Sequence, residues 1–332
     1  MPHKNVIVEC RRFGQLALRN AWRRCVLALL AWLAAGMASP ACLAQSPASQ
    51  PPRTIELLVL GSGGPRAEGR ASSSNLLLID GKPRILVDVG PGAFVRSGEL
   101  KLNLDDLDLV FFTHFHIDHS ADFPAIAKTR AQRRAGAITF NVFGPLGNPG
   151  HPSATRFIEK LFGPGGAFEY QPTFGSPEKF VIRDLPAGLA AGLAVSHAQD
   201  GLTVTTIGTS HGPTPSVAYR FDYGGCSIVF SGDTNETAAD NLVTLAKGAD
   251  LLVFNCAILD GGGSTLQSNI RHTAPRRIGE IAQRAGVKRL LLSHIQPIVD
   301  RAKDEVYRSV SAGYAGPVRF AEDKMRYDWN AR

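Results

Sequence analysis

The chain of 332 residues carries little net charge outside its first 44 residues. The formal charge is +7, but residues 1–44 hold six Lys or Arg and one acid, which leaves +2 on the remaining 288 residues. A net charge this small offers no broad phosphate-binding surface. It therefore argues against nucleic acid as a partner.

Cysteine is also scarce, with five residues in the whole chain. Cys10, Cys25 and Cys42 fall within the first 44 residues, so removal of that stretch would leave only Cys226 and Cys256. In an oxidising compartment these two thiols could pair. Two buried, unpaired apolar thiols are the alternative, and the sequence leaves both open.

Long apolar runs are missing as well. The run Cys25–Ala38 has 14 residues, which is too short to span a bilayer comfortably. It follows a basic stretch and precedes small residues near Ala44, the layout of a secretory signal. We therefore expect a signal peptide over residues 1–44, a linker over residues 45–54, and a periplasmic or secreted protein that meets the membrane only during export. A retained membrane anchor is the alternative.

The rest of the chain has ordinary globular composition, with 44% hydrophobic and 20% charged residues, which excludes a disordered, collagenous or coiled-coil protein. Short apolar runs bounded by Gly, Pro and Asp predict strands. They cover Ile55–Leu60, Asn75–Ile79, Arg84–Val89, Asp108–Thr113, Leu202–Ile207, Val217–Tyr223, Cys226–Ser231, Leu251–Asn255 and Arg289–Ser293. Helical spacing over Glu236–Lys247 and Arg276–Ala285 completes an α/β layered pattern with sheets inside and helices outside. Residues 141–180 are rich in Gly and Pro, and we expect a loop-rich lid there.

The segment Thr113–His119, Thr-His-Phe-His-Ile-Asp-His, follows the apolar strand Leu109–Phe112. Three imidazoles and a carboxylate within six residues can diverge around a turn at the end of a strand and face two adjacent cations. Imidazole and carboxylate groups suit Zn²⁺ and related transition metals. The segment therefore predicts a site for two metal ions.

This segment resembles the His-x-His-x-Asp-His signature of the metallo-β-lactamase superfamily. Other blocks follow in that family's order: LGSGGP (60–65), LVDVGPG (86–92), TSHGPTPSVAYRF (209–221), FSGDT (230–234), RHTAP (271–275) and LLLSHIQP (290–297). Within the superfamily they look most like the branch of ribonuclease Z and the zinc-dependent arylsulfatase-like hydrolases. The resemblance implies a four-layer αββα sandwich that forms one hydrolase domain over residues 55–332.

The resemblance also implies a complete ligand set. One metal would be held by His114, His116 and His211, the other by Asp118, His119 and His294, and Asp233 would bridge them. We expect two Zn²⁺, with Mn²⁺ or Fe²⁺ accepted by the same donors. Asp118 would also orient the attacking hydroxide. Asp88 would fix a ligand imidazole, or would only form a turn before a glycine.

His272 matches the histidine that is proposed to protonate the leaving oxygen in ribonuclease Z-like enzymes, and imidazole titrates in the right range for this role. A surface histidine beside a helix is the alternative. His197 is a weaker ligand candidate than His211, and His151 has no assigned role. Arg70 could meet an anionic substrate or lie in a solvated loop.

These observations predict an exported hydrolase with two metals that cleaves a phosphodiester or sulfate ester through a metal-bound hydroxide. The leader, the small net charge and the lack of a long basic Gly-rich insertion favour a small-molecule ester over nucleic acid as the substrate. The sequence does not reveal the oligomeric state, and the family resemblance leaves a homodimer open. The alternatives are a ribonuclease Z-like endoribonuclease, if the chain is not exported, and a non-catalytic binding protein of the same fold.

Overall fold

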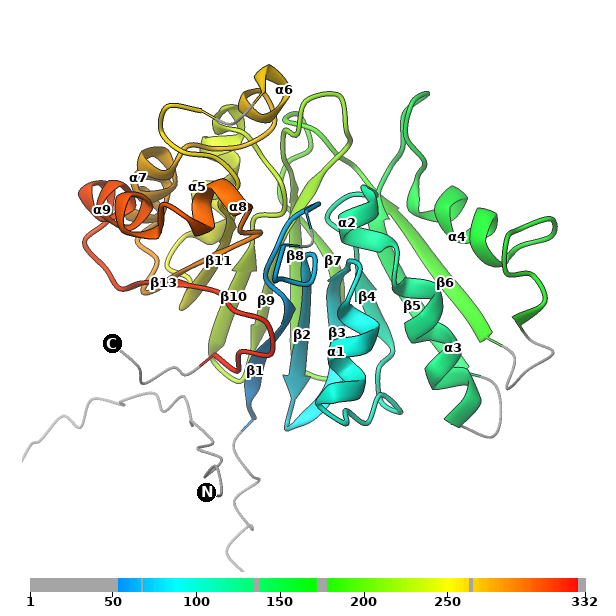
Figure 1. Cartoon of the computed structure of the whole chain (residues 1–332). Coiled ribbons are helices and arrows are strands. Elements are labelled where there is room, and N and C mark those ends of the chain that lie inside the picture. The colour runs from blue at the N-terminus through cyan, green and yellow to red at the C-terminus, as the bar shows by residue number, and fades with distance from the viewer. Residues whose placement is uncertain (1–52, 67, 134–137, 172–177, 263–264, 328–332) are drawn as a thin grey trace, which may run out of the picture. The chain divides into compact units, whose positions relative to one another are not determined.

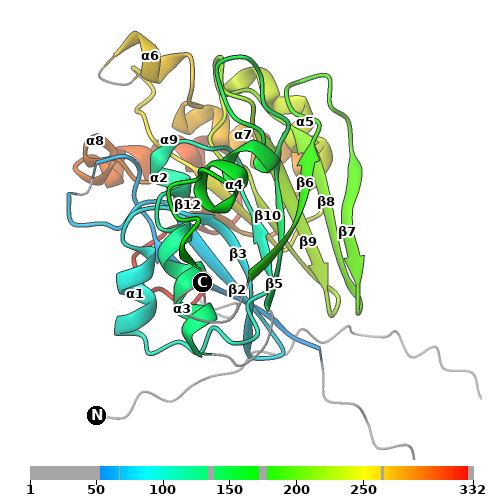
Figure 2. The same ribbon diagram turned by 90° about the vertical axis from the view of Figure 1, so that its right-hand side faces the viewer.

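The computed structural model describes residues 53–66, 68–133, 138–171, 178–262 and 265–327. The predicted leader lies outside these residues, as does nearly all of the predicted linker. Within the described ranges, no helix combines the length and the apolar character needed to cross a membrane. The described residues form two sheets that pack face to face, with helices on both outer faces (Figures 1 and 2).

The first sheet has six strands in chain order, antiparallel over the first three and parallel from the third to the sixth. They are β1 Ile55–Gly61, β2 Ser74–Ile79, β3 Lys82–Val89, β4 Leu109–Phe111, β5 Ile138–Pro145 and β6 Glu178–Leu185. Helices α1 (Ala93–Glu99), α3 (Phe123–Arg133) and α4 (Ala154–Phe162) cover its outer face through a shared apolar cluster. The parallel half places the carboxyl ends of β3 to β6 at one edge.

The second sheet has seven strands in the order β13-β12-β11-β10-β9-β8-β7. They are β7 Ala194–Gln199, β8 Leu202–Gly208, β9 Val217–Tyr223, β10 Cys226–Phe230, β11 Leu251–Asn255, β12 Leu290–Ser293 and β13 Val318–Phe320. Helices α5 (Ala239–Ala246), α7 (Pro275–Ala285) and α9 (Lys303–Gly313) pack on its outer face. Helix α7 starts on a proline and ends at Gly286 in the left-handed conformation (φ 63°), which are favourable residues for the two ends of a helix.

An apolar core fills the space between the two sheets. The ring of Phe111 stacks on Phe143, with centroids 4.4 Å apart, and meets Tyr219 and Phe221 edge-on at 5.2 and 5.1 Å. The hydroxyl of Tyr219 donates to the carbonyl of Phe112 at 2.8 Å. This contact ties the second sheet to the first directly beside the histidine-rich segment.

The structure confirms the four-layer sandwich, and the strands predicted at Val217–Tyr223 and Leu251–Asn255 have the predicted bounds. The segment 141–180, where we expected a loop-rich lid, is more regular than predicted: the end of β5, helix α4 and the start of β6 occupy part of its described residues, and a loop joins β5 to α4. Gly144 and Pro145 stand at the buried end of β5, next to Phe143, which stacks on Phe111.

In the described part of the chain Cys256 is a free, buried thiol. A disulfide between Cys256 and Cys226 is therefore excluded.

Candidate metal centre

All seven predicted ligands follow the carboxyl end of a strand. The histidine-rich segment follows β4 and runs into the short helix α2 (Ile117–Ser120), while His211, Asp233 and His294 follow β8, β10 and β12. Because β8, β10 and β12 share one direction in the second sheet, their carboxyl ends lie at one edge. This arrangement brings side chains from both halves of the chain to one place.

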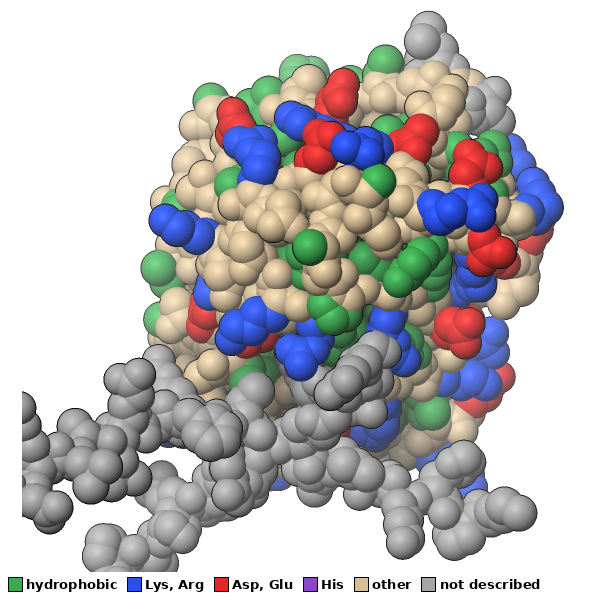
Figure 3. All heavy atoms as spheres, turned by 90° about the vertical axis from the view of Figure 1, so that its left-hand side faces the viewer, with side chains coloured by type: hydrophobic (Ala, Val, Ile, Leu, Met, Phe, Trp, Pro, Cys, Tyr) green, Lys and Arg blue, Asp and Glu red, His purple; other side chains and the backbone are tan. Residues whose placement is uncertain are grey.

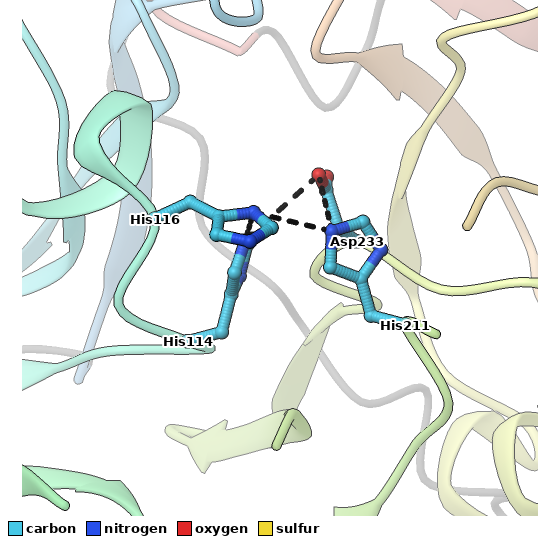
Figure 4. A group of neighbouring side chains, drawn as sticks. All are labelled: His114, His116, His211 and Asp233. Atoms are coloured by element: carbon cyan, nitrogen blue, oxygen red, sulfur yellow. Dashed lines mark hydrogen bonds and ion pairs between the residues drawn. The ribbon is translucent and has the colours of Figure 1, made fainter. Parts of the chain in front are cut away.

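The first group contains His114, His116, His211 and Asp233, whose potential ligand atoms lie within 4.8 Å of one another. The four side chains point toward a common centre (Figure 4). Nδ1 of His116 is 3.0 Å from Nε2 of His114 and 3.3 Å from Nε2 of His211. Oδ2 of Asp233 is 3.5 Å from Nε2 of His211. Three imidazole nitrogens and one carboxylate thus converge as the donors of a cation site do.

The second group contains Asp118, His119 and His294, again with ligand atoms within 4.8 Å of one another. Nε2 of His294 is 3.1 Å from Oδ2 of Asp118 and 3.4 Å from Oδ1 of Asp233. The other oxygen of Asp233 is 3.6 Å from Nε2 of His119. The carboxylate of Asp233 therefore touches both groups, as the predicted bridge requires.

Hydrogen bonds to the outer ring nitrogens orient several of these imidazoles. Nδ1 of His119 is 2.8 Å from Oδ2 of Asp88, and Nδ1 of His211 is 2.9 Å from the carbonyl oxygen of Arg271. Asp88 also accepts hydrogen bonds from the amide and the hydroxyl of Thr113. Asp88 therefore has the position that the sequence analysis expected for a residue that fixes a ligand imidazole.

Burial controls the charge on the first group. Burial lowers the pKa of His116 and of His211 to about 4, and it also holds the pKa of His114 well below its usual value. These imidazoles are therefore neutral near pH 7, and a neutral imidazole has a lone pair for a metal ion.

The second group shows the opposite balance. Burial again disfavours the charged form of His119, but Asp88 and Asp233 outweigh it and raise its pKa well above the usual value. Nε2 of His119 is buried and has no hydrogen-bond partner in the described part of the chain. A cation bound here would satisfy this nitrogen and neutralise the buried carboxylates around it. The nitrogen and oxygen donors present suit a divalent cation. The residues thus fit the metal that the fold family implies.

His272 lies beside both groups. Its ring centroid is 5.3 Å from that of His211 and 5.7 Å from that of His294. The residue is buried, its Nδ1 has no hydrogen-bond partner among the described residues, and burial lowers its pKa to about 4. The position excludes a surface histidine, while its role as the acid stays a prediction.

Two other candidates lie away from the metal centre. His197 is on β7 and packs edge-on against Phe143, with ring centroids 5.7 Å apart. Arg70 is directed into the protein, where its guanidinium donates to Asp300, to Ser62 and to the carbonyl of Ala321. Arg70 is therefore neither in a solvated loop nor available to a substrate.

Sequence reasoning left His151 unassigned and did not single out Thr214, yet both lie at the metal centre. Oγ1 of Thr214 is 3.1 Å from Nε2 of His116 and 3.3 Å from Nε2 of His151. Spacing along the chain gives no signal for this contact, because it joins the loop after β5 to the loop after β8. A groove of about 450 Å³ opens between these loops, and its lining includes both His211 and Thr214.

The family model described as "Beta-lactamase superfamily domain" matches residues 83–295. Ribonuclease Z of Mycobacterium bovis (strain BCG / Pasteur 1173P2) is 27% identical over 289 residues, which cover 84% of this chain and 99% of the relative. Among solved structures, the human short-form tRNase Z has a TM-score of 0.64 at 19% identity and covers 83% of this chain and 100% of its own. The metallo-β-lactamase fold protein YhfI of Bacillus subtilis has a TM-score of 0.61 at 21% identity, with 82% and 98% covered.

The fold and the donor set define a metal-dependent hydrolase of ester bonds that uses a divalent cation. The chain belongs to the beta-lactamase superfamily, and the curated relatives that it resembles within that superfamily are named ribonuclease Z.

The comparisons correct two expectations. The exported hydrolase of small phosphodiesters or sulfate esters is wrong as the main prediction, because relatives matched over 84% of this chain are ribonucleases Z. The expectation of a small-molecule partner in place of nucleic acid is wrong for the same reason. That expectation rested on the predicted leader and on the small net charge, and net charge does not count the cations that a metal centre would add. The leader, the periplasmic location and the homodimer stay predictions.

Proposed function

We propose that the protein is a ribonuclease Z-like endoribonuclease that hydrolyses a phosphodiester bond in RNA, with a precursor of transfer RNA as its substrate. One observation carries this proposal: two adjoining donor groups share the carboxylate of Asp233 and lie beside the buried His272. The names and the nearly full-length match of the curated relatives support RNA as the substrate.

In this proposal His114, His116 and His211 would hold one cation and Asp118, His119 and His294 would hold the other. The carboxylate of Asp233, which contacts both donor groups, would be available to both. When bound, such a pair lowers the pKa of a water molecule and neutralises charge that develops on a phosphate. The chain's own contribution is orientation. Asp88 holds the ring of His119 and the carbonyl of Arg271 holds the ring of His211, so the ligand nitrogens need little rearrangement.

His272 is the proposed proton donor to the leaving oxygen. At a pKa of about 4, caused first by burial, its imidazole is neutral near pH 7, so it would have to gain a proton before it could act as an acid. The negative charge of a phosphodiester held nearby would raise this pKa. The leaving oxygen would then receive its proton from a buried group and not from bulk water.

Zinc is the proposed metal. Five imidazoles and two carboxylates form the donor set, and this mixture is common in zinc sites, although Mn²⁺ and Fe²⁺ accept the same donors. Metal analysis after expression in medium that contains all three metals would identify the one that is retained.

The surface offers no extended region of one charge over α7 and α9. On this face Lys and Arg alternate with Asp and Glu as far as the described residues cover it (Figure 3), and ion pairs such as Arg277 with Glu280 and Arg284 with Asp240 neutralise it locally. This face therefore offers no broad phosphate-binding surface, and in this proposal the metal centre and the adjoining groove are the parts of the protein that meet the scissile phosphate.

A cleavage assay on a 3′-extended transfer RNA tests the proposal. The zinc-loaded protein should make one cut near the end of the acceptor stem, and His114→Ala should abolish it. His272→Ala should lower kcat by about 10²- to 10⁴-fold, the usual contribution of a general acid. If the wild-type protein leaves the RNA intact, or if His272→Ala cuts at the wild-type rate, the corresponding part of the proposal fails.

A further inference from the structure

Thr214 lies next to His116 although it is not among the predicted metal ligands. A turn that begins at His211 places it there, with the amide of Thr214 donating to the carbonyl of His211 at 3.3 Å. Its side chain is buried, and Oγ1 lies between Nε2 of His116 at 3.1 Å and Nε2 of His151 at 3.3 Å. These three side chains form a hydrogen-bonded row that leads away from the metal centre.

Asn148 fixes the direction of the hydrogen bonds in this row. Its amide nitrogen donates to the carbonyl of Pro213 at 2.9 Å, and its Oδ1 accepts from the amide of Gly150 at 2.9 Å. These two backbone contacts determine which end of the amide faces His151. Oδ1 is 3.1 Å from Nδ1 of His151, and an oxygen of this kind only accepts. Neutral His151 therefore carries its proton on Nδ1 and its lone pair on Nε2.

The lone pair on His151 determines the state of His116. Nε2 of His151 accepts the hydrogen bond of the Thr214 hydroxyl, which leaves the hydroxyl oxygen to accept from Nε2–H of His116. A neutral imidazole has one N–H, so the lone pair of His116 is on Nδ1. Nδ1 is the atom that lies 3.0 Å from Nε2 of His114 and 3.3 Å from Nε2 of His211.

We propose that Thr214 and His151 are positioning residues that hold His116 in the tautomer able to bind a metal ion. Hydrogen-bond partners of ligand imidazoles commonly set the tautomer in this way. His119 and His211 are held by a carboxylate and by a backbone carbonyl. His116 instead depends on a neutral hydroxyl, whose direction is set by a second histidine. The inference rests on the metal centre of the proposed function and does not require RNA as the substrate.

Matched variants of two buried threonines test the proposal. Thr214→Val removes the hydroxyl with little change in shape, and Thr214→Ser restores it. Thr209→Val is the control, because Thr209 is equally buried on the same loop and its hydroxyl pairs with Ser216 at 2.9 Å. The readouts are the zinc affinity in competition with a chelator, and ¹⁵N NMR of the imidazoles in the zinc-loaded protein. RNA cleavage is not needed.

We expect Thr214→Val to keep one zinc ion firmly and to bind the second about 10- to 100-fold more weakly, the usual effect of losing such a partner. Thr214→Ser and Thr209→Val should bind both ions as the wild type does. The NMR spectrum of the wild type should show the proton of His116 on Nε2. His151→Ala, at a half-buried position, should reproduce the loss even if Thr214→Val fails to fold.

Wild-type zinc affinity in both Thr214→Val and His151→Ala would overturn the proposal, as would a proton on Nδ1 of His116. An equal loss in Thr209→Val would do the same, because the effect would then belong to any buried hydroxyl of the loop. A wild-type protein that binds no metal would overturn both the positioning role of Thr214 and His151 and the metal centre itself. Failure to cut RNA alone would contradict only the proposed substrate.

Discussion

The side-chain amide of Asn255 donates to Oδ1 of Asp233 at 2.6 Å, and both residues are buried. Asn255 ends β11 and Asp233 follows the neighbouring strand β10, so the parallel pairing of these strands produces the contact. One oxygen of the carboxylate is thereby held, which leaves Oδ2 facing His211 and His119. Asn255 thus fixes the orientation of the residue that joins the two donor groups.

Asn255→Ala should therefore destabilise the metal-free protein. A buried carboxylate that loses a hydrogen-bond donor costs about 1.5–3 kcal/mol. Urea unfolding in the presence of a chelator measures the change. The exposed Asn103→Ala is the control, because it loses only the hydrogen bond that an exposed side chain accepts from the amide of Asp105, and its effect should stay near about 1 kcal/mol or below. An equal free energy of unfolding in Asn255→Ala and the wild type would show that the hydrogen bond between Asn255 and Asp233 does not stabilise the metal-free protein.

Asp88→Asn should weaken metal binding without disturbing the backbone. Asp88 has φ 57°, in the left-handed region, and asparagine tolerates this conformation as well as aspartate does. The substitution removes the negative charge next to Nδ1 of His119. Zinc affinity, measured by competition with a chelator, should fall by about 10- to 100-fold. Unchanged affinity would mean that Asp88 serves only the turn and Thr113.

Gly64→Ala should disturb His294 by direct contact. A Cβ at this position would lie 2.7 Å from Cε1 of His294, too close for the buried ring to stay in place. We expect weaker binding of one of the two zinc ions, by chelator competition. Gly98→Ala is the matched control, since a Cβ at Gly98 in α1 would meet nothing within 4 Å. That control should be neutral or more stable by up to about 1 kcal/mol. Equal zinc affinity in both variants would contradict the prediction.

The residues that the structure brings together in the two donor groups could be predicted from the sequence better than the residues that orient them. The ligands at positions 114–119 stand close together in the chain, so their chemistry shows in the spacing alone. Asp88 could be placed only through the family resemblance, as a residue near the end of β3. Thr214 and His151 could not, since their contact exists only when the loop after β5 meets the loop after β8. RNA, the proposed substrate, was the alternative and not the main prediction, because the predicted leader and the small net charge both argued against it.

Cell fractionation tests whether the protein can meet RNA. The leader predicted over residues 1–44 would carry the chain away from transfer RNA, whereas the proposed function requires contact with it. With a C-terminal epitope tag, immunoblotting should show the full-length protein in the cytoplasmic fraction, which contains transfer RNA. Recovery of only a shortened form in the periplasm would contradict RNA as the substrate and leave the metal centre unaffected.

The most direct measurement compares two phosphodiesters with the same zinc-loaded preparation. One is a 3′-extended transfer RNA and the other is bis(p-nitrophenyl) phosphate, which offers the scissile bond without the RNA. The account predicts a kcat/KM for the RNA that is higher by about 10³-fold or more, since binding of the remote parts of a substrate is used to lower the barrier. Equal or higher kcat/KM for the small ester, with the RNA uncut, would contradict it.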